Sequence, residues 1–358
     1  MEDRMFIDVH VIQAVPPSCI NRDDTGTPKT CQYGGVRRAR VSSQSWKRAV
    51  RTEFGKRFDE SQLSVRTKHI VELVAERIRK KNASVSEEDA MGRAVAVLEK
   101  AGVKLKKNKE GVQKTEALFF LSSKQADNLA SLAIENCEDK KTIKAALKKE
   151  SGVDIALFGR MVADDPTLNE DASVQVAHAI STHKVNPEYD YYTAIDERSP
   201  KNNVGAAMIG TTEFDSATFY RYATVSVHDL IKELEDDATV TARAVGEFIR
   251  AFVMSMPTGK MNAFANRTVP YVVLVAVRSD QPVNLVSAFE SPVAPGSEGG
   301  YTADSVKRLV REFEESCSSF VDKPVRTWQI GRGLDNIGTA QGLNDAISEI
   351  EDFVRGEH

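Results

Sequence analysis

The chain of 358 residues has no apolar run long enough to cross a membrane, because no stretch approaches about 18 uncharged apolar residues. Its first residues, Met-Glu-Asp-Arg, are too charged for a secretory signal. Cysteines are few, and none forms a Cys-x-x-Cys pair; they are Cys19, Cys31, Cys137 and Cys317. This spacing excludes a zinc knuckle and a thioredoxin-like motif, and it predicts free thiols in a reducing environment. We therefore expect a cytoplasmic protein with no membrane partner.

Clustered catalytic or metal-ligating side chains are also scarce. The histidines are dispersed, and His178 and His183 are too far out of phase to share a helical face. Asp23 and Asp24 are adjacent carboxylates in a Thr- and Gly-rich loop, without a His or Glu at metal-ligand spacing. A solvated turn is the expected structure there, and a metal-dependent nuclease centre is the alternative. We predict no catalytic residue, no metal and no cofactor.

Positive charge is concentrated in one segment, although the net charge is −4. Between Arg37 and Arg57 there are eight basic residues against one acidic residue. The serines at 42–45 offer an N-cap for a helix that reaches about Phe58. One face of this helix carries Gln44, Lys47, Arg48 and Arg51, and the opposite, core-facing side carries Trp46, Ala49, Val50 and Phe54. A helix N-terminus with hydroxyls and cations can hold RNA phosphates, and a solvated basic face is the alternative.

Two further segments have chemistry of interest. Gly259 and Lys260 lie in a sequence that lacks the second Gly and the Ser or Thr of a nucleotide-binding P-loop, but such a turn can still present N–H groups and an ammonium to a phosphate. The polar stretch 186–212 contains Tyr189, Tyr191 and Tyr192. Long polar loops with tyrosines either stack on bases or fold back onto their own core.

The pattern of apolar residues predicts an α+β fold with a ferredoxin-like core and a large helical insertion. Expected strands are Phe6–Ala14, 214–227 and 271–277, and expected helices are 240–256, 303–321 and 339–354. The residues 15–35 are expected to form a loop, and 61–180 to be mostly helical.

Several motifs, in the same order, resemble the CasC family, the crRNA-binding backbone subunit of the type I-E CRISPR Cascade complex and a member of the RAMP superfamily. They are Asn21–Asp24, Gly34–Gly35, Arg37–Arg38, Val41–Arg48, Gly152–Leu157, Gly159–Met161, Ala177–His183 and Phe219–Ala223. The resemblance is weakest from Ser61 to Glu150.

The resemblance implies a shape like a right hand and no catalysis. The RRM-like palm would comprise 1–60 and 213–358, the helical fingers 61–180, and the protruding thumb loop 186–212. The usual aromatic RNP motif is not visible. Copies would polymerise head to tail along crRNA, each thumb folding over RNA held by its neighbour. Implied partners are crRNA, target double-stranded DNA, further copies of the chain and other Cascade subunits.

The resemblance also assigns residues. Arg22, Lys29, Ser42, Gln44, Lys47 and Arg48 would cradle RNA phosphates, Gly159, Arg160 and Met161 would lie against bases, and Tyr191, Tyr192 and Thr193 would belong to the thumb. We also expect RNA contacts from Arg51, Gly259 and Lys260, which follow from the residue patterns described above and not from the resemblance. Lys140, Lys141, Lys144 and Lys148 would face target DNA, where one basic family position is replaced by Leu147.

Two other functions remain open. Related RNA-targeting CRISPR backbone subunits cut RNA with a loop aspartate, which makes Asp23 or Asp24 the candidate of a metal-dependent ribonuclease. A metabolic enzyme with a nucleotide site at Gly259 and Lys260 is the third hypothesis.

Overall fold

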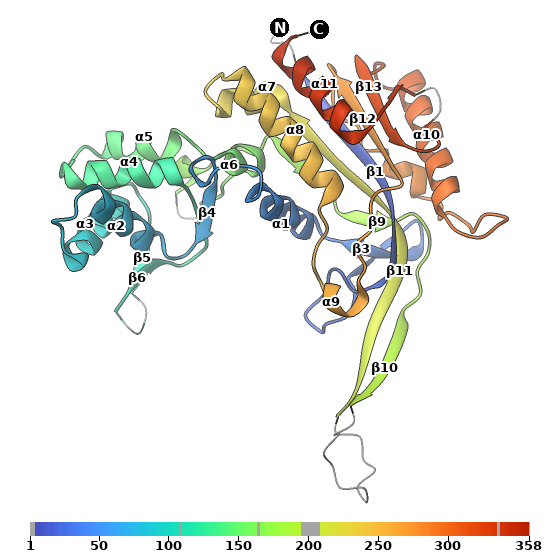
Figure 1. Cartoon of the computed structure of the whole chain (residues 1–358), viewed down its shortest axis with the longest axis horizontal. Helices are drawn as coiled ribbons and strands as arrows, with labels where there is room; N and C mark the ends of the chain where they lie inside the picture. Colours follow the sequence, from blue (N-terminus) through green and yellow to red (C-terminus); the bar gives the residue numbers. More distant parts are fainter. Residues whose placement is uncertain are drawn as a thin grey trace, which may run out of the picture. The chain divides into compact units, whose positions relative to one another are not determined.

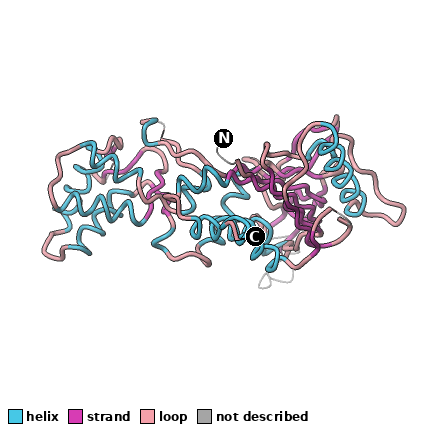
Figure 2. Tube along the Cα trace, turned by 90° about the horizontal axis from the view of Figure 1, so that it is seen from above, coloured by secondary structure: helices cyan, strands magenta, loops and turns pink. Residues whose placement is uncertain are grey.

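The computed structural model describes residues 4–107, 109, 111–162, 165–194, 208–334 and 337–357. The chain divides into two compact units (Figure 1). The first comprises Met1–Val50, Val176–Thr224 and Phe248–Glu349, and the second Arg51–Gln175, Val225–Glu247 and Ile350–His358. Figure 2 shows that strands dominate the first unit and helices the second. The division into palm, fingers and thumb follows other boundaries and stays a prediction.

The first unit is built on a large, mainly antiparallel sheet in the order β14-β13-β12-β1-β11-β9-β3-β2, with β8 and β10 also paired to β11. Its strands are β1 (Phe6–Ser18), β2 (Thr30–Tyr33), β3 (Val36–Val41), β8 (Val174–Val176), β9 (Ala179–Ser181), β10 (Glu188–Ala194), β11 (Met208–Ser226), β12 (Val272–Arg278), β13 (Arg326–Gly331) and β14 (Thr339–Ala340). Only the β13–β14 pair among the described pairings is parallel.

The apolar strand β12 shows why this sheet forms. Successive side chains of a strand point to opposite faces, so alternate residues share a core. Val272, Leu274 and Ala276 pack in one cluster with α10 (Thr302–Ser319) and the short helix η3 (Leu285–Phe289). All seven residues of β12 are buried, so both faces of the strand are covered. The mixed α+β class predicted from the sequence is therefore confirmed.

The second unit is mostly helical, as predicted. Its helices are α2 (Ile70–Lys81), α3 (Glu87–Lys100), α4 (Ser123–Ile134), α5 (Lys140–Lys148), α6 (Val153–Phe158) and α7 (Val227–Glu233), with the short η1 (Glu60–Gln62) and η2 (Pro166–Leu168). Short strands missed by the pattern are β4 (Ser64–Thr67), β5 (Leu105–Lys107), β6 (Gln113–Thr115) and β7 (Phe119–Ser122). Ser86 caps α3, because its hydroxyl accepts a hydrogen bond from the Asp89 N–H.

Three of the remaining helices agree with the periodic pattern. They are α1 (Ser43–Phe54), α8 (Ala238–Met254) and α11 (Leu343–Arg355), whereas the short α9 (Met261–Phe264) was not predicted. Among the residues that the structure describes, no helix is long and apolar enough to cross a membrane. All four cysteines are free thiols, as expected.

Two loop predictions are wrong. The residues 15–35 include the end of β1 and all of β2, and 188–194 pair in register with 208–214 as the β10–β11 hairpin. Figure 1 shows this hairpin extending away from the rest of the sheet. Because β10 is exposed along its whole length, it needs no apolar face, and the apolar alternation that identifies a strand is missing. The intervening residues 195–207 lie outside the described part of the chain.

Candidate nucleic-acid interface

The helix α1 separates an apolar and a polar face, as the sequence predicts. Trp46, Val50 and Phe54 are buried, whereas Gln44 and Arg48 are exposed. The first turn contains no acidic residue, so no carboxylate compensates the positive end of the helix dipole within that turn. The N-terminus of α1 therefore favours an anion.

The loop after β1 is docked on this N-terminus through Asn21. The amide oxygen Oδ1 of Asn21 accepts a 2.9 Å hydrogen bond from the Ser42 N–H, and its carbonyl accepts one of 2.8 Å from the Lys29 N–H. Arg22 follows Asn21 and is exposed, and Lys29 is half-buried. Ser42 itself is only 6% exposed, so it fixes the loop to the helix through its backbone. This role of Asn21 could not be predicted from local sequence patterns, because its partner Ser42 is 21 residues away.

The Gly259–Lys260 turn approaches the same loop. A Cβ atom on Gly259 would lie 2.4 Å from the carbonyl oxygen of Ile20, so only glycine fits this close approach. Lys260 has a φ of 45°, and its Nζ donates a 3.4 Å hydrogen bond to Oγ1 of Thr212 at the base of the hairpin. Burial raises the pKa of the Cys19 thiol; the charges of Lys260 and Arg22 oppose this shift, whereas those of Asp215 and Glu213 add to it.

Three segments distant in sequence therefore meet in the first unit. We name their polar residues the α1 surface; it consists of Arg22, Lys29, Gln44, Lys47, Arg48 and Lys260. Burial lowers the pKa of Lys47, which is half-buried.

Arg51 is one helical turn further along but is engaged inside the second unit. Its Nη2 and Nε lie 3.0 and 3.2 Å from Oδ2 of Asp154, and Nη2 also donates to the Ser64 carbonyl at 3.3 Å. Its guanidinium covers the Phe120 ring at 4.2 Å. These contacts give Arg51 a structural role, and the RNA contact expected from the helical face stays a prediction.

The segment 159–161 contains two residues with structural contacts, Gly159 and Arg160, and one exposed residue, Met161. Gly159 ends α6 with a φ of 74°, and a Cβ there would lie 2.8 Å from the Glu170 carbonyl oxygen. Arg160 is 4% exposed and donates to three carbonyls, to Gln125 and to the Glu170 carboxylate. Met161 is 81% exposed. A base that approaches this segment can meet the Met161 side chain, whereas the Arg160 guanidinium holds the fold together.

The hairpin places its two neighbouring tyrosines on opposite faces. Tyr191 is directly opposite Thr211 and shares its face with Thr193, whereas Tyr192 is opposite Gly210. Tyr191 is 64% exposed. Tyr192 is 41% exposed, and its ring covers Gly210 so closely that a Cβ there would lie 2.5 Å from it. The two rings therefore cannot form a single stacking platform.

The lysines of α5 form a stripe beside the buried Ile143 and Leu147. Lys140, Lys141 and Lys148 are exposed. Lys144 is paired with Asp165 at 2.8 Å, and this hydrogen bond, with that from Thr167, lowers the pKa of Asp165 to about 2. Leu147 is fully buried. Leu147, which stands where the resembled family has a basic residue, is therefore a core residue of this chain.

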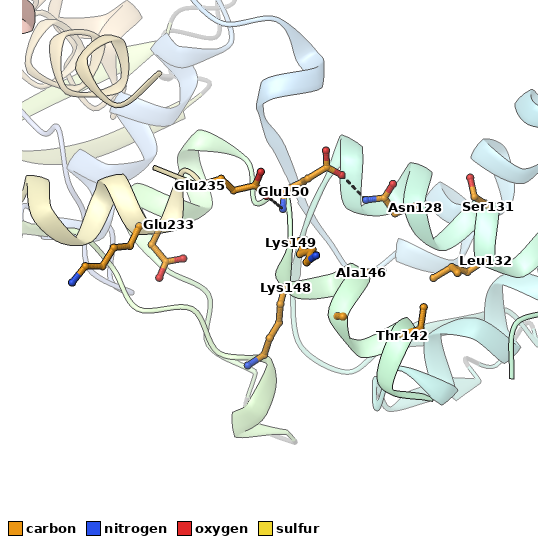
Figure 3. A pocket seen from close by; sticks show the side chains of 12 residues that line it. Asn128, Ser131, Leu132, Thr142, Ala146, Lys148, Lys149, Glu150, Glu233 and Glu235 are labelled. Atoms are coloured by element: carbon orange, nitrogen blue, oxygen red, sulfur yellow. Dashed lines mark hydrogen bonds between the residues drawn. The ribbon is translucent and has the colours of Figure 1, made fainter. Parts of the chain in front are cut away.

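Lys148 also lines a pocket of about 760 Å³ beside Lys149 and Lys232 (Figure 3). Carboxylates of Glu150, Glu233 and Glu235 line the same pocket. Burial raises the pKa of Glu233. Because both charge signs are interspersed, the pocket does not form an anion site comparable to the α1 surface.

Asp23, the aspartate of the nuclease hypothesis, is used by its own loop. Its Oδ1 accepts from the Thr25 N–H, the Thr25 hydroxyl and the Thr27 N–H, and its Oδ2 accepts from the Thr27 hydroxyl at 2.8 Å. These bonds lower the pKa of Asp23 to about 2. No group of metal-ligating side chains occurs within the described ranges. The carboxylate thus shapes a turn, as expected from the sequence.

Comparison with known proteins gives a consistent result. A family model described as CT1975-like protein matches residues 7–355. A subunit of a solved "CRISPR RNA-guided surveillance complex, pre-nicking" is 34% identical, with a TM-score of 0.86, over 99% of this chain and 100% of that one. A subunit of a second "CRISPR RNA-guided surveillance complex" is 31% identical, with a TM-score of 0.74, over 96% and 99%. No curated protein matches the chain.

Proposed function

The chain belongs to the family of CT1975-like proteins, and we propose that its α1 surface grips the phosphate backbone of crRNA. It is a non-catalytic backbone subunit of a type I-E CRISPR Cascade surveillance complex, in which it works with crRNA and other subunits. Which residues touch the RNA, and how copies of the chain are arranged along it, are the parts that we propose here.

The observation that carries the proposal is the meeting of three cationic segments at one helix N-terminus. Arg22 comes from the loop after β1, Lys47 and Arg48 from α1, and Lys260 from the turn after α8. A guide has an arbitrary sequence, so its carrier should hold phosphates and leave the base edges free to pair. Cations and helix N–H groups provide this kind of contact.

The strand order supports an RRM-like, ferredoxin-like palm. Along the chain, β1, α1, β9, β11, α8 and β12 form a βαββαβ sequence, and in the sheet these strands lie in the order β12-β1-β11-β9. The first strand is thus central, between the third and the fourth, as in that fold. On this assignment the palm comprises 1–60 and 213–358, the fingers 61–180 and the thumb 186–212.

The hairpin supports the thumb assignment, because it extends from the sheet and carries the exposed Tyr191 (Figure 1). We propose that copies polymerise head to tail on crRNA, with each hairpin acting on RNA held by the next copy. Lys140, Lys141 and Lys148 would then face the target double-stranded DNA that pairs with the guide.

The test is the salt dependence of RNA binding by the Lys47→Ala/Arg48→Ala variant. Removal of two phosphate contacts should weaken binding to unrelated RNA sequences alike and reduce the log–log salt slope by roughly 1.4, at about 0.7 per single-strand contact. Fluorescence anisotropy with two labelled RNAs of different sequence measures both effects.

A matched control removes two cations from α10. Lys307 and Arg311 are both 77% exposed and pair with Asp304 and Glu315 of the same helix. The Lys307→Ala/Arg311→Ala variant should keep the wild-type slope. An unchanged slope in the α1 variant, or an equal change in the α10 variant, would place the RNA elsewhere.

A further inference from the structure

Arg221 is buried in the first unit and has no acidic partner among the residues that the structure describes. It belongs to the Phe219–Ala223 segment of β11 and is 1% exposed. Its guanidinium carbon lies 3.7 Å from the centre of the Trp46 ring and 4.7 Å from that of Phe252, so the cation is held between two aromatic side chains. No described carboxylate forms an ion pair with it. Burial lowers the pKa of Arg221 to about 9.

The hydrogen bonds of Arg221 continue through Gln13. Nη2 donates to the Phe252 carbonyl, and Nη1 donates to Oε1 of Gln13 at 2.5 Å. Because a guanidinium has only donors, the amide oxygen of Gln13 must face Arg221. The amide nitrogen of Gln13 then points the other way and donates to the carbonyl and hydroxyl oxygens of Thr268 at 3.0 and 3.1 Å. It also lies 3.3 Å from Sδ of Met256.

The two ends of this network belong to the two segments that carry proposed RNA contacts. Trp46 directly precedes Lys47 on α1. Met256 and Thr268 are the two ends of the segment that carries Lys260, and the Thr268 hydroxyl is further tied to the Ala14 carbonyl at 2.8 Å. One buried guanidinium thus connects the phosphate-binding helix with the base of the Gly259–Lys260 loop.

An apolar side chain would fill this position with a smaller desolvation penalty. Replacement of buried ionic groups by apolar residues of similar volume is often neutral or stabilising, so a buried arginine without a carboxylate is not explained by stability. The guanidinium of Arg221 is planar, donates hydrogen bonds in two directions and can stack on aromatic rings. It can therefore fix the orientation of Trp46, Phe252 and Gln13, which an apolar side chain cannot do.

We propose that Arg221 is a positioning residue for RNA binding. It holds α1 and the segment 256–268 in the one arrangement in which Lys47, Arg48 and Lys260 address the same stretch of phosphates. This inference rests on the proposed function of the α1 surface.

The test is Arg221→Met, measured by thermal unfolding and by RNA binding of the folded protein. The melting temperature should stay within about 4 °C of wild type or rise. RNA affinity should fall about tenfold, equivalent to one well-placed charge-assisted contact, and the salt slope should decrease.

Arg278→Met is the matched control. Arg278 is another fully buried arginine of the first unit, but its Nε lies 3.1 Å from Oδ2 of the buried Asp8. The control variant should lose thermal stability, because it leaves Asp8 unpaired, and its folded fraction should bind RNA with wild-type affinity and slope. Opposite responses of the two variants separate positioning from general support of the fold.

Wild-type RNA affinity and salt slope in Arg221→Met would overturn the proposal. If Arg221→Met does not fold, Arg221→Lys is tested in its place, because it keeps the charge but not the planar guanidinium. Arg221→Lys should show the same loss of RNA affinity, and wild-type RNA binding by this variant would also overturn the proposal. If the salt slope of RNA binding decreases in Lys47→Ala/Arg48→Ala but RNA binding is normal in the Arg221 variant, the positioning role of Arg221 is refuted and the α1 surface is not. An unchanged slope in the Lys47→Ala/Arg48→Ala variant refutes the α1 surface itself.

Discussion

Replacement of Tyr191 and Tyr192 by alanine, one at a time, separates two roles in the β10–β11 hairpin. The register places the rings on opposite faces, Tyr191 beside Thr193 and Tyr192 over Gly210. Tyr191→Ala should therefore impair RNA-dependent assembly and leave the hairpin intact. Tyr192→Ala should loosen the hairpin and affect assembly only through that loosening.

The magnitudes follow from exposure. Base–aromatic stacking contributes about 1–3 kcal/mol per base, so loss of the Tyr191 ring should weaken each stacked contact by about 5-fold to 150-fold. Since Tyr191 is 64% exposed, its truncation removes little buried area. Tyr192 is 41% exposed, so more than half of its surface is covered. The apolar part of that cover stabilises the hairpin by about 1–2 kcal/mol.

Two assays read these effects independently. Analytical ultracentrifugation with a long RNA measures assembly, and hydrogen exchange of the amides in 188–194 and 208–214 measures opening of the hairpin. The melting temperature of the free subunit should stay near wild type in both variants, because the hairpin lies outside the core. Normal assembly of Tyr191→Ala, or faster exchange in Tyr191→Ala than in Tyr192→Ala, would refute the assignment of the two faces.

Three further outcomes are expected. The purified chain should leave RNA and DNA intact on a denaturing gel with Mg²⁺ or Mn²⁺, and cleavage abolished by Asp23→Ala would restore the nuclease hypothesis. Burial raises the pKa of Asp215 to about 6. Between about pH 4 and 6 the folded state then binds more protons than the unfolded state, so stability falls as pH rises through this window. Asp215→Asn should raise the free energy of unfolding by up to about 3 kcal/mol above pH 6 and change it little below pH 4, as measured by urea titrations. Lys141→Ala should weaken the binding of target DNA to RNA-loaded assemblies more than Lys144→Ala does, because Lys144 is held 2.8 Å from Asp165. Equal losses of DNA affinity in the two variants would show that DNA opens the Lys144–Asp165 pair.

The elements with an apolar period could be predicted from the sequence, and the exposed ones could not. β12 and α8 agree with their predicted ranges within two residues, because each buries an apolar face that repeats with the period of its own structure. β10 is exposed throughout, and its pairing partner is separated from it by residues 195–207. Nothing local distinguishes such a strand from a polar loop.

The α1 helix shows how far the candidate site could be predicted. Its amphipathic pattern correctly predicts that Trp46 is buried and that Gln44 and Arg48 are exposed. The pattern does not reveal that Arg51, on the same face, pairs with Asp154, because Asp154 is about 100 residues distant in the sequence. A helical wheel contains no information about such partners.

We therefore rank the cations proposed to bind RNA by their burial and by their carboxylate partners, and not by their number alone. Arg51 and Arg160 each have a carboxylate partner inside the second unit. A buried guanidinium with such a partner is accounted for by the fold, since removal of either member would leave an unpaired buried charge. Arg221 does not fit this explanation, because its described partners are two aromatic rings, a carbonyl and an amide. Trp46, which that guanidinium contacts, directly precedes Lys47 in the sequence, and the segment 256–268, which the guanidinium reaches through Gln13, contains Lys260. A buried charge that the fold does not need is thus itself evidence for where the binding geometry is set.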